Sequence, residues 1–225
     1  MPTLSDLRVR YDEDYYERGV ECGISGYSNY RWLPELTIPM AMTIIDTLGI
    51  SPRQTILDFG CAKGYVVKAL RMLRRDATGV DISPYAIEQS DPAVAGHVHL
   101  IESLTTWRDA RLFDFVLAKD VLEHVPHESI HEVIGGLASR ARCALAVVPL
   151  GDGERYTIEA YERDVTHVIR EPAEWWAEQF GAHFGHVEWT YHVEGIKDNW
   201  KRVHPRGNAV IIAGPDAAAC AGQAA

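Results

Sequence analysis

From residue 55 to residue 148, short apolar segments alternate with segments of helical periodicity. Parallel strands need a crossover between them, and a helix usually forms it, so this alternation predicts a mostly parallel sheet covered by helices on both faces. The expected strands are residues 55–59, 77–80, 98–101, 113–118 and 144–148, followed by two late strands at 186–193 and 208–213. The expected helices are residues 65–74, 84–89 with Ser83 as N-cap, 127–140 and 172–180.

A chain of 225 residues fits one domain with a sizeable core. We expect residues 1–50 to form an aromatic-rich arm and a helix that Thr37 caps and Gly49 ends, packed on a core domain of residues 51–213. The polar segment 150–170 is too long for a plain connection and is predicted to be a lid. The alanine-rich residues 214–225 are expected to be a flexible tail.

Charge and composition exclude several classes of partner. The formal net charge of −10 disfavours binding to bulk nucleic acid or to anionic lipid surfaces. The sequence shows neither a signal peptide nor an apolar run of membrane-spanning length, so we expect a soluble, cytoplasmic protein. The four cysteines lack CxxC spacing, and we interpret them as reduced thiols. The oligomeric state stays open.

One loop has the features of a nucleotide site. The apolar strand 55–59 runs into a turn with Gly60 and Gly64 and then into a helix, so the backbone can approach a ligand closely and the helix offers unpaired N–H groups. Asp81 ends the next strand about 20 residues further on, where a carboxylate accepts hydrogen bonds from ribose hydroxyls. The glycine spacing does not match Gly-x-Gly-x-x-Gly, which makes a dinucleotide such as NAD the weaker candidate.

Three segments resemble the class I S-adenosylmethionine (SAM)-dependent methyltransferases, in particular the branch that contains ubiquinone-pathway enzymes. They are residues 56–64 (ILDFGCAKG), 79–81 (GVD) and 113–125 (FDFVLAKDVLEHV), and the resemblance covers residues 55–150 firmly. One departure is Ala62, which stands where the family has the middle glycine of its loop. The resemblance implies a Rossmann-like α/β fold whose seven-stranded, mostly parallel sheet has the order 3-2-1-4-5-7-6, with the seventh strand antiparallel.

The resemblance also implies where SAM, and its product S-adenosylhomocysteine, would bind. Asp58 and Gly60 would lie near the methionine part, Asp81 at the ribose, and Glu102 with Ser103 beside the adenine. Lys119 and Asp120 would border the sulfonium. The full set of implied cofactor residues is Asp58, Gly60, Cys61, Ala62, Gly64, Asp81, Ile82, Glu102, Ser103 and Lys119.

The acceptor is expected in the crevice above the carboxyl ends of the fourth and fifth strands, under the 150–170 lid. Methyl transfer from a sulfonium needs positioning and exclusion of water, and a hydroxyl acceptor also benefits from a base. Our candidates for that base are Asp164 and His167 in the lid, with His124 and Asp120 in reserve. We expect a small-molecule acceptor, such as a sugar or natural product, with O-methylation slightly favoured.

Two other functions remain open at this point. His127-Glu-Ser-Ile-His131 matches His-Glu-x-x-His, the pattern in which two histidines bind zinc for hydrolysis. No third-ligand helix follows it, so we interpret both histidines as exposed helix residues and assign no metal ligands. The protein could also be a SAM-binding module without catalysis, because binding and transfer share one cofactor motif.

Overall fold

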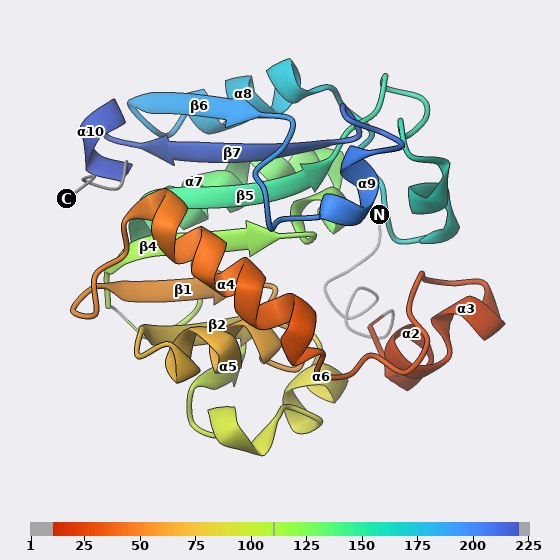
Figure 1. Cartoon of the computed structure of the whole chain (residues 1–225), viewed down its shortest axis with the longest axis horizontal. Coiled ribbons are helices and arrows are strands. Elements are labelled where there is room, and N and C mark those ends of the chain that lie inside the picture. Colours follow the sequence, from red (N-terminus) through yellow and green to blue (C-terminus); the bar gives the residue numbers. More distant parts are fainter. Residues whose placement is uncertain (1–10, 110, 221–225) are drawn as a thin grey trace.

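The computed structural model describes residues 11–109 and 111–220 and contains one seven-stranded sheet in the order β3-β2-β1-β4-β5-β7-β6 (Figure 1). β7 is antiparallel to both of its neighbours, and the other neighbouring strands pair in parallel. The predicted fold class and strand order are therefore confirmed. The strands are β1 Thr55–Phe59, β2 Asp76–Asp81, β3 Val98–Leu100, β4 Phe113–Lys119, β5 Ala141–Pro149, β6 His186–Thr190 and β7 Asn208–Gly214.

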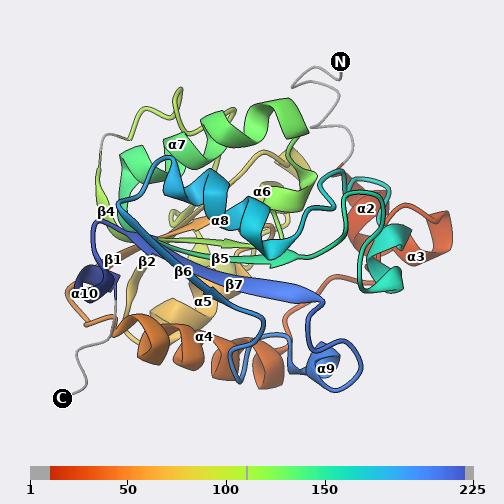
Figure 2. The same cartoon turned by 90° about the horizontal axis from the view of Figure 1, so that it is seen from above.

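Helices cover both faces of the sheet. Figure 2 shows α4 and α5 on one face and α7 and α8 on the other. Ser83 caps α6 as predicted, since its side chain accepts a hydrogen bond from the N–H of Ala86. The helices are α2 Glu13–Glu17, α3 Gly19–Cys22, α4 Pro34–Leu48, α5 Tyr65–Met72, α6 Pro84–Glu88, α7 Ile130–Arg140, α8 Ala173–Gly181, α9 Asp198–Lys201 and α10 Ala217–Cys220, with short 3₁₀ turns η1 Pro92–Val94, η2 Leu122–His124, η3 His127–Ser129 and η4 Glu159–Arg163.

The core consists of two apolar layers, one on each face of the sheet. Neighbouring residues of a strand point to opposite faces, so Leu57 joins the layer under α7 and α8, whereas Ile56 joins the layer under α4 and α5. Both residues are fully buried. The sheet therefore holds the loops at its carboxyl edge on a rigid support.

Helix α4 begins earlier than the sequence indicated. Pro34 occupies its first turn, and Thr37 lies inside the helix, where its hydroxyl donates to the carbonyl of Leu33. The proposed Thr37 cap is therefore wrong: a proline at the first helical position needs no N–H partner, and so the helix can begin there. Gly49 does end the helix, in a left-handed conformation.

The N-terminal arm lies on the carboxyl side of the parallel strands, and Figure 1 shows α2 and α3 on the side to which the arrowheads of β1 and β4 point. Its buried rings, Tyr11, Tyr15 and Tyr16, form an aromatic cluster that packs on Ala62 and Ile82 of the two predicted cofactor loops. The arm is thus part of the wall of that edge.

Two cysteines form a disulfide, which contradicts our interpretation of all four as reduced thiols. Cys143 of β5 bonds to Cys220 of α10, at a sequence separation of 77 and with 5.8 Å between their Cα atoms. Only the fold brings these positions together, so spacing could not reveal the pair. Cys22 and Cys61 are free thiols.

The C-terminal residues 214–220 do not form the expected flexible tail, because Gly214 belongs to β7 and Cys220 is buried. Residues 221–225 lie outside the described part of the chain.

Within the described ranges, no helix combines the length and apolar character needed to cross a membrane.

Candidate functional site

The sheet brings the predicted cofactor residues to one edge. They sit at or just after the carboxyl ends of β1, β2, β3 and β4, which are neighbours in the sheet and run in the same direction. Strand pairing places Asp58 beside Gly79, two residues before Asp81. Loops from four neighbouring strands thus face a common space.

The loop after β1 is closely fitted to the loop after β4. Gly60 has a φ angle of +77°, and a Cβ built on it would lie 2.4 Å from a methyl carbon of Val121. Ala62, at the position of the family's middle glycine, has a φ angle of +48°, so this alanine takes a left-handed conformation that glycine adopts at lower cost. Gly64 has no side chain to cap α5, which leaves the first N–H groups of that helix for a ligand.

Two buried carboxyl groups, Asp58 and Asp81, end the neighbouring strands β1 and β2. Asp81 accepts hydrogen bonds from the N–H groups of Ala62, at 2.7 Å, and Ser83, at 2.8 Å. Asp58 Oδ2 has no hydrogen-bond partner within the described residues, although Asp58 is only 4% exposed. Burial and then the neighbouring Asp81 raise the pKa of Asp58 to about 7. Such a pair suits a ligand with N–H and O–H donors and a positive charge, and SAM carries all three.

Glu102 and Ser103 follow β3 at the same edge and are less enclosed. Glu102 is exposed, and the Ser103 hydroxyl exchanges hydrogen bonds of 2.9 Å with Thr105 and Thr106. These residues therefore border the site from its open side.

Lys119 and Asp120 end β4 and form an ionic cluster with Lys197. Both ammonium groups contact the Asp120 carboxylate, and Lys197 also donates to the Tyr161 hydroxyl at 2.9 Å. Burial alone would raise the pKa of Asp120, but Lys119 and Lys197 outweigh it and hold that pKa below its usual range. Asp120 is therefore a fixed anion and a poor proton acceptor.

His124, Thr166, Asp164 and Tyr15 form a hydrogen-bonded chain. The Thr166 hydroxyl lies 2.5 Å from Asp164 Oδ1 and 2.7 Å from His124 Nδ1, and Tyr15 donates to Asp164 Oδ2 at 2.9 Å. The single Thr166 proton goes to the carboxylate, so His124 Nδ1 carries a proton and donates to Thr166. The lone pair of His124 is consequently on Nε2.

His167 lies against His124, with 4.6 Å between the ring centroids. Its Nδ1 is 2.9 Å from the carbonyl oxygen of Tyr161, an acceptor only, which fixes the proton on Nδ1 and the lone pair on Nε2. That Nε2 is 3.8 Å from Asp164 Oδ2 and 3.9 Å from Glu123 Oε1. Segment 150–170 and the loop after β4 thus bring two imidazole rings to one place.

Electrostatics favours uncharged histidines here. Burial and then His167 lower the pKa of His124 to about 4, and burial lowers the pKa of His167. Burial and then Asp120 raise the pKa of Glu123 to about 8. At neutral pH both imidazoles are therefore uncharged, and the ring nitrogen that carries the lone pair can accept a hydrogen bond.

The His127 to His131 string does not form a metal site. His127 lies in η3 and pairs with Glu171 at 3.2 Å, while His131 lies in α7 with its ring 4.3 Å from that of His183. Among the described residues, the group of metal-ligating side chains that lie together is Glu123, His124 and His167 instead. The pattern is interrupted because its first turn is 3₁₀ and not α-helical.

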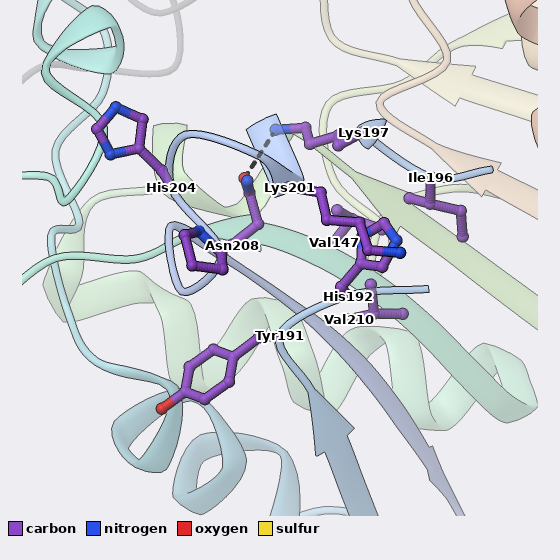
Figure 3. A pocket seen from close by; sticks show the side chains of 10 residues that line it. Val147, Tyr191, His192, Ile196, Lys197, Lys201, His204, Asn208 and Val210 are labelled. Atoms are coloured by element: carbon purple, nitrogen blue, oxygen red, sulfur yellow. Dashed lines mark hydrogen bonds between the residues drawn. The ribbon is translucent and has the colours of Figure 1, made fainter. Parts of the chain in front are cut away.

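A solvent-open hollow lies beside the ionic cluster (Figure 3). Lys197 and Asn208 line it and are joined by a hydrogen bond of 3.2 Å, and Lys201 and His204 add basic groups to its wall. The connection between β6 and β7 supplies these residues, so it contributes positive charge next to the end of β4.

Sequence reasoning named His124, Asp164, His167 and Asp120, which the fold brings close together, and did not name Glu123 or Lys197. Glu123 stands directly before His124 in the segment that carries the resemblance, and that position was the available signal. Lys197 follows β6 and has no motif around it. Lys197 contacts Asp120 only because the fold places the connection between β6 and β7 next to the end of β4.

Comparison with known proteins identifies the family of this chain. The family model described as a methyltransferase domain matches residues 39–202. The mitochondrial ubiquinone biosynthesis O-methyltransferase of Schizosaccharomyces pombe is 30% identical over an alignment of 102 residues, and that alignment covers 41% of this chain. The match spans 37% of that relative's length.

Solved structures share the fold at low sequence identity. A SAM-dependent methyltransferase from Archaeoglobus fulgidus has a TM-score of 0.61 and 18% identity, covering 80% of this chain and 94% of the other. The [4+2]-cyclase SpnF has a TM-score of 0.64 and 13% identity, covering 95% and 97%. These likenesses show the fold alone, whereas the family model covers well over half of the chain. The protein therefore belongs to the SAM-dependent methyltransferases, with SAM as its cofactor.

Proposed function

We propose that the protein transfers the methyl group of SAM to a hydroxyl group of a small molecule, and that the acceptor oxygen binds beside His124 and His167. The observation that carries this proposal is the pair of Nε2 lone pairs at the end of β4, held by Tyr161 and Thr166. The net charge of −10 supports a small acceptor over nucleic acid. The O-methyltransferase relative from S. pombe is a further support.

In this proposal the cofactor lies along the ends of β1 to β4. Asp58 and Gly60 hold the methionine part, Asp81 the ribose, and Glu102 with Ser103 the adenine, while Cys61, Ala62, Gly64 and Ile82 complete the wall and Lys119 borders the sulfonium. The bound cofactor supplies an electrophilic methyl group whose sulfur leaves without protonation. The unpartnered Oδ2 of buried Asp58 is available for the cofactor's amino group.

The residues of the lid position the acceptor and exclude water. His167 is 9% exposed and Glu123 is 1% exposed, so the acceptor oxygen meets a site with little solvent. The Nε2 atom of His167 accepts the hydrogen bond of the hydroxyl and takes its proton as the oxygen attacks, while His124 lies against the His167 ring. Asp164 is a positioning residue, because Tyr15 and Thr166 occupy its oxygens.

The test uses SAM with a ¹³C-labelled methyl group and a panel of phenols, sugars, hydroxy acids, amines and thiols. We expect an O–¹³CH₃ signal in the product together with S-adenosylhomocysteine. His167→Gln should lower kcat by about 100-fold or more while SAM affinity changes little. His131→Gln, outside the site, is the matched control. Methylation of nitrogen or sulfur, or unchanged kcat in His167→Gln, would contradict the proposal.

A further inference from the structure

The geometry points to an anion-binding site in the hollow shown in Figure 3, where a carboxylate or phosphate group of the methyl acceptor would bind. Its use by the acceptor rests on the proposed function, whereas the anion site itself does not. The basic groups of the hollow come from residues 191–207, which connect β6 to β7. The position, the charge and the hydrogen-bond donors of the hollow each support this assignment.

The hollow lies directly beside the proposed acceptor site. Val147 of β5 is part of its wall, and the carbonyl oxygen of Val147 accepts a hydrogen bond of 3.0 Å from the N–H of Asp120 at the end of β4. Nζ of Lys197 lies 4.7 Å from the centroid of the Tyr161 ring, and that centroid is 6.0 Å from the centroid of the His167 ring. Tyr161 therefore packs against both the wall of the hollow and the proposed base, which places the two within reach of one small molecule.

The wall of the hollow is basic, although the formal net charge of the chain is −10. The described residues that line it include two lysines and two histidines and no carboxyl group. Lys201 is exposed and forms no ion pair with any described residue. Asp198, an acid of the same connection, accepts from the N–H of Gly195 at 2.9 Å and lies 3.4 Å from Nε2 of His192. An anion in the hollow would therefore meet positive charge that the wall itself does not neutralise.

The neighbouring ionic cluster leaves a further positive charge unbalanced. Lys119 and Lys197 both contact the Asp120 carboxylate, so two ammonium groups share one negative charge. Glu123 does not offset the difference at neutral pH, because burial and then Asp120 raise its pKa to about 8. In the proposed function, the sulfonium of SAM adds another positive charge beside Lys119. An acceptor with an anionic group would balance this excess.

Asn208 supplies uncharged donors to the hollow. Its side-chain oxygen accepts from the hydroxyl of Tyr161 at 2.7 Å and from Nζ of Lys197 at 3.2 Å (Figure 3). Because both partners donate, the oxygen faces them and the NH₂ group of the amide is turned away. No described residue accepts a hydrogen bond from that NH₂ group. Two N–H donors thus remain for the oxygen atoms of an anion.

The rest of the wall indicates the kind of molecule that carries the anion. Tyr191, Ile196 and Val210 contribute apolar and aromatic surface to the hollow. Pockets of this mixed kind bind a carbon skeleton on the apolar wall and orient it by a few polar groups. The assigned acceptors are therefore small hydroxylated carboxylic acids or small hydroxylated phosphate esters, and uncharged phenols and sugars are the poorer substrates.

The binding test uses the full chain and two simple anions. In ¹H–¹⁵N NMR spectra, inorganic phosphate or acetate should shift the side-chain NH₂ signals of Asn208, and sodium chloride at the same ionic strength should not. The stronger of the two anions distinguishes a phosphate ester from a carboxylate as the natural ligand. Unshifted Asn208 signals with both anions would overturn the anion site.

Variants of exposed cations test the same site without disturbing the core. Lys201→Gln combined with His204→Gln should weaken phosphate or acetate binding at least about 10-fold, because both donors to the anion are lost. Arg53→Gln is the matched control, since Arg53 is an exposed cation before the amino end of β1, at the opposite edge of the sheet. Equal affinity in the double variant and the control would overturn the anion site.

The kinetic test compares hydroxyl acceptors in matched pairs, such as a hydroxybenzoate with its methyl ester and a sugar phosphate with the free sugar. The anionic member should have a kcat/KM at least about 10-fold higher. Lys201→Gln should raise the KM of that member about 10-fold and leave kcat within about twofold, because Lys201 binds the acceptor away from the reacting oxygen. Arg53→Gln should change neither constant.

Binding and activity together separate this inference from the proposed function. Methylation of hydroxyl groups with equal kcat/KM for both members of each pair would refute the use of the hollow by the acceptor and leave the function standing. Phosphate or acetate binding that the double variant weakens, with no hydroxyl methylated, would uphold the anion site and refute the function.

Discussion

Tyr15 donates a hydrogen bond of 2.9 Å to Asp164, although 149 residues separate the two in sequence. The bond joins the N-terminal arm to segment 150–170, and both groups are buried. Asp164 also accepts from Thr166, which orients His124. The arm therefore supports the geometry of the acceptor site from a distance along the chain.

Tyr15→Phe should lower the free energy of unfolding by about 1–3 kcal/mol, because it leaves a buried carboxylate oxygen without its donor. Urea denaturation measures the loss. Tyr65→Phe is the matched control, since the Tyr65 hydroxyl makes a long bond of 3.4 Å to the carbonyl of Tyr30. An equal loss in the two variants would argue against a special role for the bond between Tyr15 and Asp164.

Gly60→Ala should destabilise the protein by at least about 2 kcal/mol and weaken SAM binding. The new Cβ would meet Val121 at 2.4 Å, and the φ angle of +77° strains any side chain. Thermal unfolding and titration with SAM measure the two effects. The double variant Gly60→Ala with Val121→Ala should recover part of the stability, and its failure to do so would show that backbone strain alone is responsible.

Ala62→Gly should raise the free energy of unfolding by about 0.5–1 kcal/mol, a change opposite in sign to that of Gly60→Ala. Ala62 adopts a φ angle of +48°, and the strain that glycine relieves exceeds the entropy that glycine adds to the unfolded chain. Denaturation midpoints at constant m-value provide the measurement. A less stable Ala62→Gly protein would show that the methyl group of Ala62, which packs on the aromatic arm, contributes more than the strain costs.

Asp58→Asn should make stability depend less on pH. The folded pKa of Asp58 is raised to about 7 by burial and by Asp81, whereas the unfolded pKa is about 3.9. The folded state therefore keeps a proton that the unfolded state loses. The stabilisation from this proton is fully present below about pH 4 and declines as the pH rises. Above about pH 7 it is lost, and the total loss in the free energy of unfolding is on the order of 4 kcal/mol.

The measurement is urea denaturation of cofactor-free wild type and Asp58→Asn between pH 4 and pH 8. The difference between the two curves isolates Asp58 from other groups that titrate in this range, such as Glu123. Parallel curves would show that the Asp58 carboxyl does not stay protonated in the folded protein.

Cys220→Ser should lower the free energy of unfolding by about 4 kcal/mol, because the disulfide closes a segment with a sequence separation of 77 residues. Reductant should lower the melting temperature of the wild type to that of the variant and leave the variant unchanged. Thiol titration of the unfolded wild type should find two free thiols, from Cys22 and Cys61. Four free thiols would contradict the bond.

The sequence by itself determined the order of the elements and the cofactor loops. Periodicity placed β1 at residues 55–59 correctly and the other strands to within a few residues, because these patterns depend on local burial. Gly60 and Asp81 could be singled out from the strand-turn-helix pattern, whereas Asp58 was named from the family resemblance.

Only the tertiary structure decided which distant residues meet. Cys143 and Cys220, Lys197 and Asp120, and Tyr15 and Asp164 are joined across long stretches of chain. Glu123 and His167 also meet only in the folded chain, with 3.9 Å between Oε1 and Nε2. Local patterns record which face of an element is buried, whereas such contacts depend on how the sheet orders its strands and on where the loops at its carboxyl edge pack.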